Sequence, residues 1–454
     1  MRNKIVIAGA GHGGIVAARE LALQGFEVHV YEKKGRDNLS WDWRDNMELD
    51  TFQEIGIPEP KKSDYLRPEN LTFLSPDEEI QLESQRPMEE REITIERRFL
   101  INYLIDLALD AGASVQFNQK VIGPLIEENV VHGIRLKNQQ IKADLIIDST
   151  GIDAVLRTQL PKSYKMDFNL RRGELFHTYR GYFNKNSSNQ SMGSYYKVIL
   201  GYQNKRGIAW VNTSNEYADV LIGCIDPFKK DEIESLLDDL RSKFPEIGKK
   251  LIRGGQIAPI PIRRTAPLLV GANFALIGDA AWMTKPVTGS GISNSMIAGK
   301  ILADITIKSF QNSSEPANEN YSYSIEELWK YQYEYYKKIG ADNGFVDVIK
   351  DYLMTTSFEN MNFIFHKKLI TADDLEAGQS GEELDLSIID GIFRLFRSFP
   401  RFGVIIELAS NLRRASLTKK HFLAIPEHYD EQKVASWINK GKTFYEGYYK
   451  KLEG

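Results

Sequence analysis

The chain has only one cysteine, Cys224, among its 454 residues. A single thiol cannot form an internal disulfide framework or a cysteine-based metal site, and it fits a reducing compartment. The seven histidines are scattered, and none forms a metal-binding pair on a helix, so we predict no metal site. These absences exclude disulfide-stabilised secreted domains and structural zinc proteins.

Long apolar runs and blocks of basic charge are absent as well. No run approaches the ~20 apolar residues that span a bilayer. The first expected strand begins by Lys4, which leaves no room for a signal peptide. The net charge is −4 without a basic block, so we predict no nucleic-acid partner. We therefore expect a cytoplasmic protein, at most in peripheral contact with the inner face of the membrane.

The N-terminus has the pattern of a dinucleotide-binding unit. A β-branched run at 4–8 precedes Gly9-Ala10-Gly11-His12-Gly13-Gly14, and a helical stretch and a second strand ending in Glu32 follow. Glycines at 9, 11 and 14 permit, in turn, a tight turn, the approach of a pyrophosphate and close packing of helix on strand. Glu32 follows at the spacing that lets a carboxylate reach ribose hydroxyls. The alternative is a glycine-rich turn that only packs.

A second segment, residues 278–292, predicts the other half of this site. It lies between an apolar strand at 274–277 and a helix that begins near Ser293. Asp279 can accept hydrogen bonds from a ribose hydroxyl. Amides around Gly289 to Ile292 lie at a helix N-terminus, where an anion is favoured. The two segments together predict a site for a large anionic cofactor.

The remaining patterns predict three parts in an α/β fold. A Rossmann-like cofactor domain is expected from residues 1–165 and 255–310, with a helix at 97–111 and a buried parallel strand within 143–151 that ends in a Thr-Gly turn. Short strand-like runs rich in aromatic residues predict an inserted antiparallel β-sheet domain at 166–254, which would cover a substrate. The C-terminal part, 311–454, is expected to be mostly helical, with helices at 325–339 and 385–399.

The order of these motifs resembles the flavin monooxygenase-like fold. Within it, Pro286-Val287-Thr288-Gly289-Ser290-Gly291-Ile292 resembles the FAD-dependent geranylgeranyl reductases. Gly254-Gly255, Pro259, Arg264 and the archaeal-like stretch 367–375 extend the resemblance along nearly the whole chain. Reductases of this family reduce prenyl double bonds in archaeal lipids and in chlorophyll or quinone side chains.

The resemblance implies FAD as the cofactor and an apolar, prenyl-type lipid as the substrate, with reduction of its carbon-carbon double bonds. The electron donor would be ferredoxin, a deazaflavin or NAD(P)H. A flavin-dependent monooxygenase of an aromatic or apolar substrate is the alternative, and a flavoprotein without catalysis is a third. Arg97 would contact the cofactor, unless it is only a surface charge. The implied cofactor-binding residues are Gly9, Gly11, Gly13, Gly14, Glu32, Arg97, Val121, Asp279, Gly289, Gly291 and Ile292.

Two departures from the family pattern concern the catalytic and substrate sides. Trp43 stands where these reductases often have a cysteine, which excludes a thiol mechanism, whereas Asp45 is kept; these two are the catalytic candidates. Trp43 would either stack on flavin or a prenyl chain, or pack into the core. On the substrate side the family often has a Tyr-x-Trp-x-Phe-Pro segment, of which residues 208–213 keep only Trp210. The substrate candidates are Trp210, Tyr179 and His177. The proton donor could be Asp45, Tyr179, His177 or a bound water.

The C-terminal part carries two groups of aromatic residues. The first lies on one expected helix, at Trp329, Tyr331, Tyr333, Tyr335 and Tyr336. The second is Phe393, Phe396, Phe399 and Phe402, with arginines at 394, 397, 401, 413 and 414. They would form either a lipid tunnel mouth with basic residues at a membrane surface or ordinary helical packing, and we favour packing.

Overall fold

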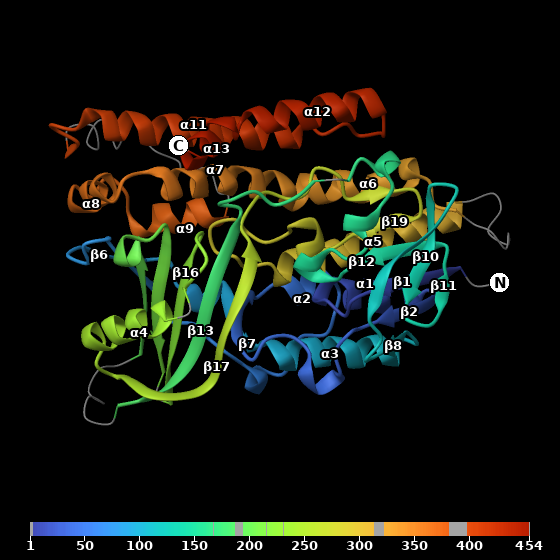
Figure 1. Cartoon of the computed structure of the whole chain (residues 1–454), viewed down its shortest axis with the longest axis horizontal. Helices are drawn as coiled ribbons and strands as arrows, with labels where there is room; N and C mark the ends of the chain where they lie inside the picture. The colour runs from blue at the N-terminus through green and yellow to red at the C-terminus, as the bar shows by residue number, and fades with distance from the viewer. Residues whose placement is uncertain are drawn as a thin grey trace.

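A mostly parallel sheet of short β-branched strands forms the cofactor half of the protein (Figure 1). The computed structural model describes residues 3–166, 168–186, 194–214, 216–229, 231–312, 322–380 and 397–453. The central strands are buried on both faces, as continuous apolar runs in parallel sheets are. In spatial order the strands are β18 (Val270–Gly271), β19 (Phe274–Leu276), β12 (Leu145–Asp148), β1 (Lys4–Ala8), β2 (Glu27–Tyr31) and β8 (Ser114–Gln116).

Two helices that follow the glycine segments pack directly on each other. They are α1 (His12–Leu23) and α5 (Ile292–Asn312), and a Cβ built on Gly13 would lie 2.1 Å from the Ser295 carbonyl oxygen. The close approach brings the two predicted halves of the cofactor site together. This half also contains α3 (Arg97–Asp110) and a meander of β9 (Val121–Glu127), β10 (Val130–Leu136) and β11 (Gln140–Lys142).

The second large sheet has seven strands and supports the substrate side. Its order is β17 (Ile247–Pro261), β13 (Leu175–Lys185), β16 (Tyr217–Cys224), β15 (Gly207–Thr213), β14 (Tyr195–Leu200), β5 (Leu71–Leu74) and β6 (Gln81–Glu83). Helix α4 (Glu232–Lys243) covers one face (Figure 1). The sheet differs from the expected one at 166–254, because β5 and β6 come from far earlier in the chain and β17 runs past residue 254. The β14–β5 pair is parallel, the other pairs antiparallel.

A small antiparallel sheet completes the β structure near the cofactor segments. It consists of β3 (Arg44–Glu48), β7 (Glu92–Glu96) and β4 (Tyr65–Leu66), and β7 leads directly into α3. Asp45 lies on β3 and Arg97 is the first residue of α3. The sheet therefore joins Asp45, a catalytic candidate, to Arg97, a predicted cofactor-binding residue. The short helix α2 (Thr51–Glu54) follows β3.

The last third of the chain is helical, as predicted. Figure 1 shows α11 and α12 in an outer layer, with α7 and α6 beneath them and the two large sheets below. Trp329, Tyr331, Tyr335 and Tyr336 are buried in the core, which supports the packing interpretation. Phe393, Phe396 and Arg394 lie outside the described residues, as does most of the helix expected at 385–399. The helices are α6 (Ile325–Tyr335), α7 (Ala341–Thr355), α8 (Phe358–His366), α9 (Ala372–Ser380), α11 (Phe402–Leu423), α12 (Glu431–Thr443) and α13 (Glu446–Glu453).

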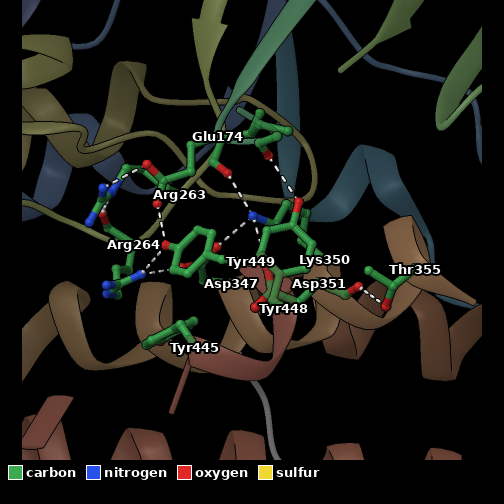
Figure 2. Close-up of polar contacts among 12 residues, drawn as sticks. Glu174, Arg263, Arg264, Asp347, Lys350, Asp351, Thr355, Tyr445, Tyr448 and Tyr449 are labelled. Atoms are coloured by element: carbon green, nitrogen blue, oxygen red, sulfur yellow. Dashed lines mark hydrogen bonds and ion pairs between the residues drawn. The ribbon is translucent and has the colours of Figure 1, made fainter. Parts of the chain in front are cut away.

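A buried cluster of charges connects α7 to the segment that follows β17 (Figure 2). Lys350 of α7 is 1% exposed; its Nζ lies 2.9 Å from Asp347 Oδ1 and 3.0 Å from Asp351 Oδ1, and it donates to the Ile262 carbonyl. Arg264, just after β17, pairs with Asp347 at 3.1 Å. Charges this deeply buried are tolerated only when they are paired. The cluster is therefore the polar anchor between α7 and the segment that leads to Gly278.

Candidate functional site

One large cavity connects both glycine segments to the C-terminal helices. Its volume is about 1160 Å³. At one end it is lined by the cofactor segments and by Glu32, and at the other by residues of α7, α8, α9 and α11. The small sheet and the seven-stranded sheet line the region between. The cavity therefore has a polar arm in the cofactor half and an arm between the seven-stranded sheet and the helices.

The N-terminal glycine turn forms the floor of the polar arm. Gly9 has φ +88°, a left-handed conformation that favours glycine, and Gly9, Gly11 and Gly13 line the cavity. Glu32 is fixed at its edge, because its carboxylate accepts from the amides of Ala10 (2.9 Å) and Lys34 (2.8 Å). Its remaining lone pairs can accept from ribose hydroxyls.

Gly14 and Val121 take different positions in this arm. Gly14 does not line the cavity; its Cα faces Ser149, whose Oγ would lie 2.6 Å from an added Cβ. Its direct cofactor contact is therefore not supported, and its role is the close packing of helix on strand. Val121 is buried at the Glu32 end and does line the cavity. This is the end at which the fingerprint places an adenosine.

The second glycine segment lines the opposite wall. Asp279, Gly289, Gly291 and Ile292 all border the cavity, and α5 begins at Ile292. Helix N-termini carry free amides and a partial positive charge. Burial raises the pKa of the Asp279 carboxyl, while Arg97 opposes this shift. Among the described residues none donates a hydrogen bond to that carboxyl, so it is open to a hydroxyl of a ligand.

Two buried nitrogen atoms in this arm have no hydrogen-bond partner among the described residues. His12 Nε2 and Arg97 Nε accept or donate no hydrogen bond to any described residue, and both side chains line the cavity. Burial, together with the charge of Arg97, lowers the pKa of His12 to about 3, so the imidazole is neutral at physiological pH. Unpaired buried polar atoms cost free energy unless a ligand satisfies them. They fit a bound dinucleotide that carries phosphate and flavin oxygens.

Asp45 is a carboxylate held between two guanidinium groups. Arg97 Nη1 donates to it at 2.9 Å from the cofactor half, and Arg180 Nη1 at 3.3 Å from β13. Arg180 is itself buried and pairs with Asp219 at 2.6 Å. Both oxygens of the Asp45 carboxyl therefore accept a hydrogen bond from a guanidinium group, and Asp45 orients the two arginines at the cavity wall.

Trp43 and Trp210 both border the cavity. Trp43 is 3% exposed and packs with Tyr182 and Ala258, as the core-packing interpretation expects. It also lines the cavity, as the ligand-stacking interpretation expects. Each interpretation therefore describes part of its position. Trp210 on β15 lines the cavity with the Arg180 guanidinium 5.2 Å from its ring centre. The two tryptophans therefore flank Arg180 in the region between the two arms.

Tyr179 and His177 lie away from the cavity, so their assignment to the substrate side is corrected. Successive side chains on a strand point to opposite faces. Arg180 occupies the cavity face of β13, which turns residues 177 and 179 to the other face. Tyr179 packs there with Leu236 and Leu240 of α4.

Trp282, which follows Gly278-Asp279-Ala280-Ala281, also lies outside the cavity lining. It is buried in a left-handed conformation, with φ 54°. The guanidinium groups of Arg157 and Arg263 lie 4.9 Å and 4.1 Å from its ring centre. Its position is explained by stacking of cations on an aromatic ring.

The arm between the seven-stranded sheet and the helices is mainly apolar. Side chains from β5, β14 and β15 form one wall, and side chains from α7, α8, α9 and α11 form the other. They include Leu71, Phe73, Val198, Ile208, Leu353, Met361, Phe365, Leu375, Leu408 and Leu412. In the described part of the chain, no helix is both long and apolar enough to cross a bilayer.

Comparisons with known proteins agree with this geometry. The sequence model of the FAD binding domain family matches residues 2–305. The chain is 21% identical over 451 residues to digeranylgeranylglycerophospholipid reductase of Sulfolobus acidocaldarius, covering 96% of each chain. It is 27% identical over 313 residues to the enzyme of that name from Methanocella arvoryzae, covering 66% of this chain and 76% of the other.

A solved structure has the same fold over most of its length. The geranylgeranyl bacteriochlorophyll reductase-like protein of Thermoplasma acidophilum aligns with a TM-score of 0.69 at 20% identity, covering 91% of this chain and all of the other. The comparisons confirm the resemblance to the geranylgeranyl reductases.

Proposed function

This chain belongs to the FAD binding domain family, with FAD as its cofactor, and we propose that it reduces carbon-carbon double bonds of a prenyl lipid of the geranylgeranyl type. The observation that carries the proposal is the continuous cavity. Its polar arm fits FAD through Gly9, Gly11, Gly13, Glu32 and the second glycine segment, and it opens into an apolar arm within the same wall. The relatives' names support the same substrate class.

The residues around the cavity bind and orient, whereas bound FAD in its reduced form supplies the hydride. The start of α5 places positive potential beside the polar arm, which stabilises negative charge there. Trp43, Trp210 and the apolar side chains exclude water from the bound double bond. Since no second dinucleotide fingerprint occurs in the sequence, we propose that ferredoxin, a deazaflavin or transiently bound NAD(P)H delivers the electrons.

The function is tested by anaerobic reoxidation of the reduced flavoprotein. The holoenzyme is reduced with dithionite, and geranylgeranylated lipid or its fully saturated counterpart is added. We expect the unsaturated lipid alone to restore the oxidised flavin spectrum. If only oxygen reoxidises the flavin, and does so faster when the lipid is present, the protein is a monooxygenase and the proposal is wrong.

We also propose that the apolar arm receives its lipid from a membrane surface at the start of α11. Phe399, Phe402 and Ile406 are exposed there by 65%, 42% and 63%, and Leu408 and Leu412 of the same helix line the cavity. Exposed apolar side chains beside a lipid cavity are typical of interfacial contact. We place the protein, on this basis, at a membrane surface, and we propose the cytoplasmic face because the single thiol fits a reducing compartment.

Flotation with anionic vesicles measures this contact. The triple variant Phe399→Ser, Phe402→Ser, Ile406→Ser is expected to lower co-flotation at least several-fold, because burying each side chain in lipid contributes roughly 1 kcal/mol or more. A matched variant, Leu66→Ser, Leu251→Ser, Ile252→Ser, removes side chains that are exposed elsewhere and is expected to float like the unaltered protein. Absence of flotation of the unaltered protein contradicts the membrane contact.

A further inference from the structure

The small sheet presents a row of paired polar side chains, and two carboxyls in it border the cavity. β3 and β7 are antiparallel, with Glu48 directly opposite Glu92. The next pair on this face is Asn46 and Thr94, joined by a hydrogen bond of 2.7 Å. Both Glu48 and Glu92 line the cavity. Like charges directly opposite each other in a sheet repel, so this pair needs a physical explanation.

Cations pair with the carboxylates next to Glu92 but not with Glu92 itself. Lys285, in the second glycine segment, forms an ion pair with Glu48. Arg91 pairs with Glu376 of α9 at 2.7 Å. Glu92 forms no ion pair or hydrogen bond through its side chain with any of the described residues. A proton on Glu92 would remove the negative charge that no described cation pairs with.

The local electrostatics shift the pKa values of Glu92 and Glu48 in opposite directions. Burial first, and then the charge of Glu48, raise the pKa of Glu92 to about 7; Lys285 and Arg91 oppose this shift and Glu376 adds to it. Although burial acts against it, Lys285 lowers the pKa of Glu48. Neighbouring carboxyls with pKa values pushed apart are typical of acid-base sites. At neutral pH Glu48 is a carboxylate, and a large fraction of Glu92 is a protonated acid beside the cavity.

We propose that Glu92 is the catalytic acid that protonates the substrate double bond, an inference that rests on the proposed reduction of a prenyl lipid. The double bond receives a hydride from the reduced cofactor at one carbon. Its electron pair forms a C–H bond with the Glu92 proton at the other carbon, and the O–H bond breaks. The products are a saturated carbon pair, the oxidised cofactor and a Glu92 carboxylate, which solvent reprotonates.

The other candidates for this proton are less suited. Both carboxyl oxygens of Asp45 already accept hydrogen bonds from guanidinium groups. Tyr179 and His177 lie on the far face of β13 and do not line the cavity. Asp279 belongs to the cofactor arm, where its open carboxyl suits a ligand hydroxyl. Glu92 combines cavity access, a missing counter-ion and a proton at neutral pH.

The first test compares the holoenzyme with Glu92→Gln and with Glu83→Gln, an exposed glutamate on β6. Reoxidation of the reduced enzyme by geranylgeranylated lipid should be ~100-fold slower or more in E92Q, as for loss of a general acid. In the unaltered enzyme the rate should fall as the pH rises through about 7, because only the protonated carboxyl donates. E92Q should lose this dependence and E83Q should keep it, with lipid and FAD affinity unchanged in both.

A second readout does not depend on turnover. In the infrared difference spectrum of the unaltered enzyme minus E92Q, the C=O band of a protonated carboxyl should be present at pH 6 and fade as the pH rises through about 7, whereas the difference between the unaltered enzyme and E83Q should lack this band. Other carboxyls with a raised pKa, such as Asp351, contribute equally to both spectra and cancel. If lipid reoxidises the unaltered enzyme and E92Q equally fast, or if E92Q only weakens lipid binding, the role of Glu92 is overturned. If the band behaves as expected but no prenyl lipid reoxidises the unaltered enzyme, the proposed function has failed instead.

Discussion

Replacing Lys350 by methionine is expected to destabilise the folded chain by about 3–5 kcal/mol, the usual cost of removing one partner from a buried ion pair. Methionine keeps the volume of the side chain but leaves Asp347 and Asp351, each 1% exposed, beside each other without their shared cation. Their mutual repulsion in a buried site cannot be relieved by water. The thermal unfolding midpoint should fall by several degrees, and Lys440→Met, at an exposed position on α12, should leave it unchanged.

The pH dependence of the stability deficit in K350M distinguishes a loss of ion pairing from a loss of packing. Burial and the neighbouring Asp347 raise the pKa of Asp351, and removal of Lys350 should raise it further. A carboxyl whose pKa is higher in the folded than in the unfolded state stabilises the folded chain at low pH. This stabilisation is lost as the pH rises through the folded-state pKa. The deficit of K350M should therefore be smaller at pH 5 than at pH 8, and adding Asp351→Asn should recover part of it. A deficit that is the same at both pH values indicates lost packing and contradicts the ion-pair explanation.

Replacing Gly13 by valine is expected to weaken FAD binding at least ~100-fold, or about 2.7 kcal/mol. A Cβ at this position would lie 2.1 Å from the Ser295 carbonyl oxygen and 2.5 Å from Ile277 Cγ2, so α1 must move away from α5. We propose that the amides at the first turn of each helix bind the cofactor. Fluorescence titration of the apoprotein with FAD measures the affinity.

The control for this substitution is Gly403→Val. Gly403 lies on α11 with no heavy atom within 4 Å of a built Cβ, so only a small helix-propensity effect is expected. Circular dichroism confirms whether G13V is folded, and Gly13→Ala, with a smaller side chain, should lose affinity in the same direction. FAD affinity of folded G13V equal to that of the unaltered protein contradicts the two-part cofactor site.

The cofactor half could be predicted because its physical requirements are local. β1 and β2 begin and end at the predicted residues, since a β-branched run before a glycine turn determines both the strand and its end. Glu32, Asp279 and Gly291 border the cavity because they follow the carboxyl ends of neighbouring parallel strands or open a helix. No long-range information is needed to place them.

The substrate half could not be predicted in the same way, because its geometry depends on pairing between distant segments. Alternation along β13 shows that residues 177 and 180 point to opposite faces, but not which face the cavity occupies. The parallel pairing of β14 with β5 joins segments more than a hundred residues apart. Glu92 belongs to no motif, and its missing counter-ion is visible only when β3, α9 and Lys285 are placed around it.

The measurement that tests the central claim most directly is the mass of the lipid after a single anaerobic turnover. The reduced holoenzyme is mixed with a slight deficit of geranylgeranylated lipid, and the product is analysed by mass spectrometry together with the flavin spectrum. We expect each flavin reoxidised to be matched by one double bond that has gained two hydrogen atoms. Reoxidised flavin with unchanged lipid, or a product that has gained oxygen on exposure to air, contradicts the account.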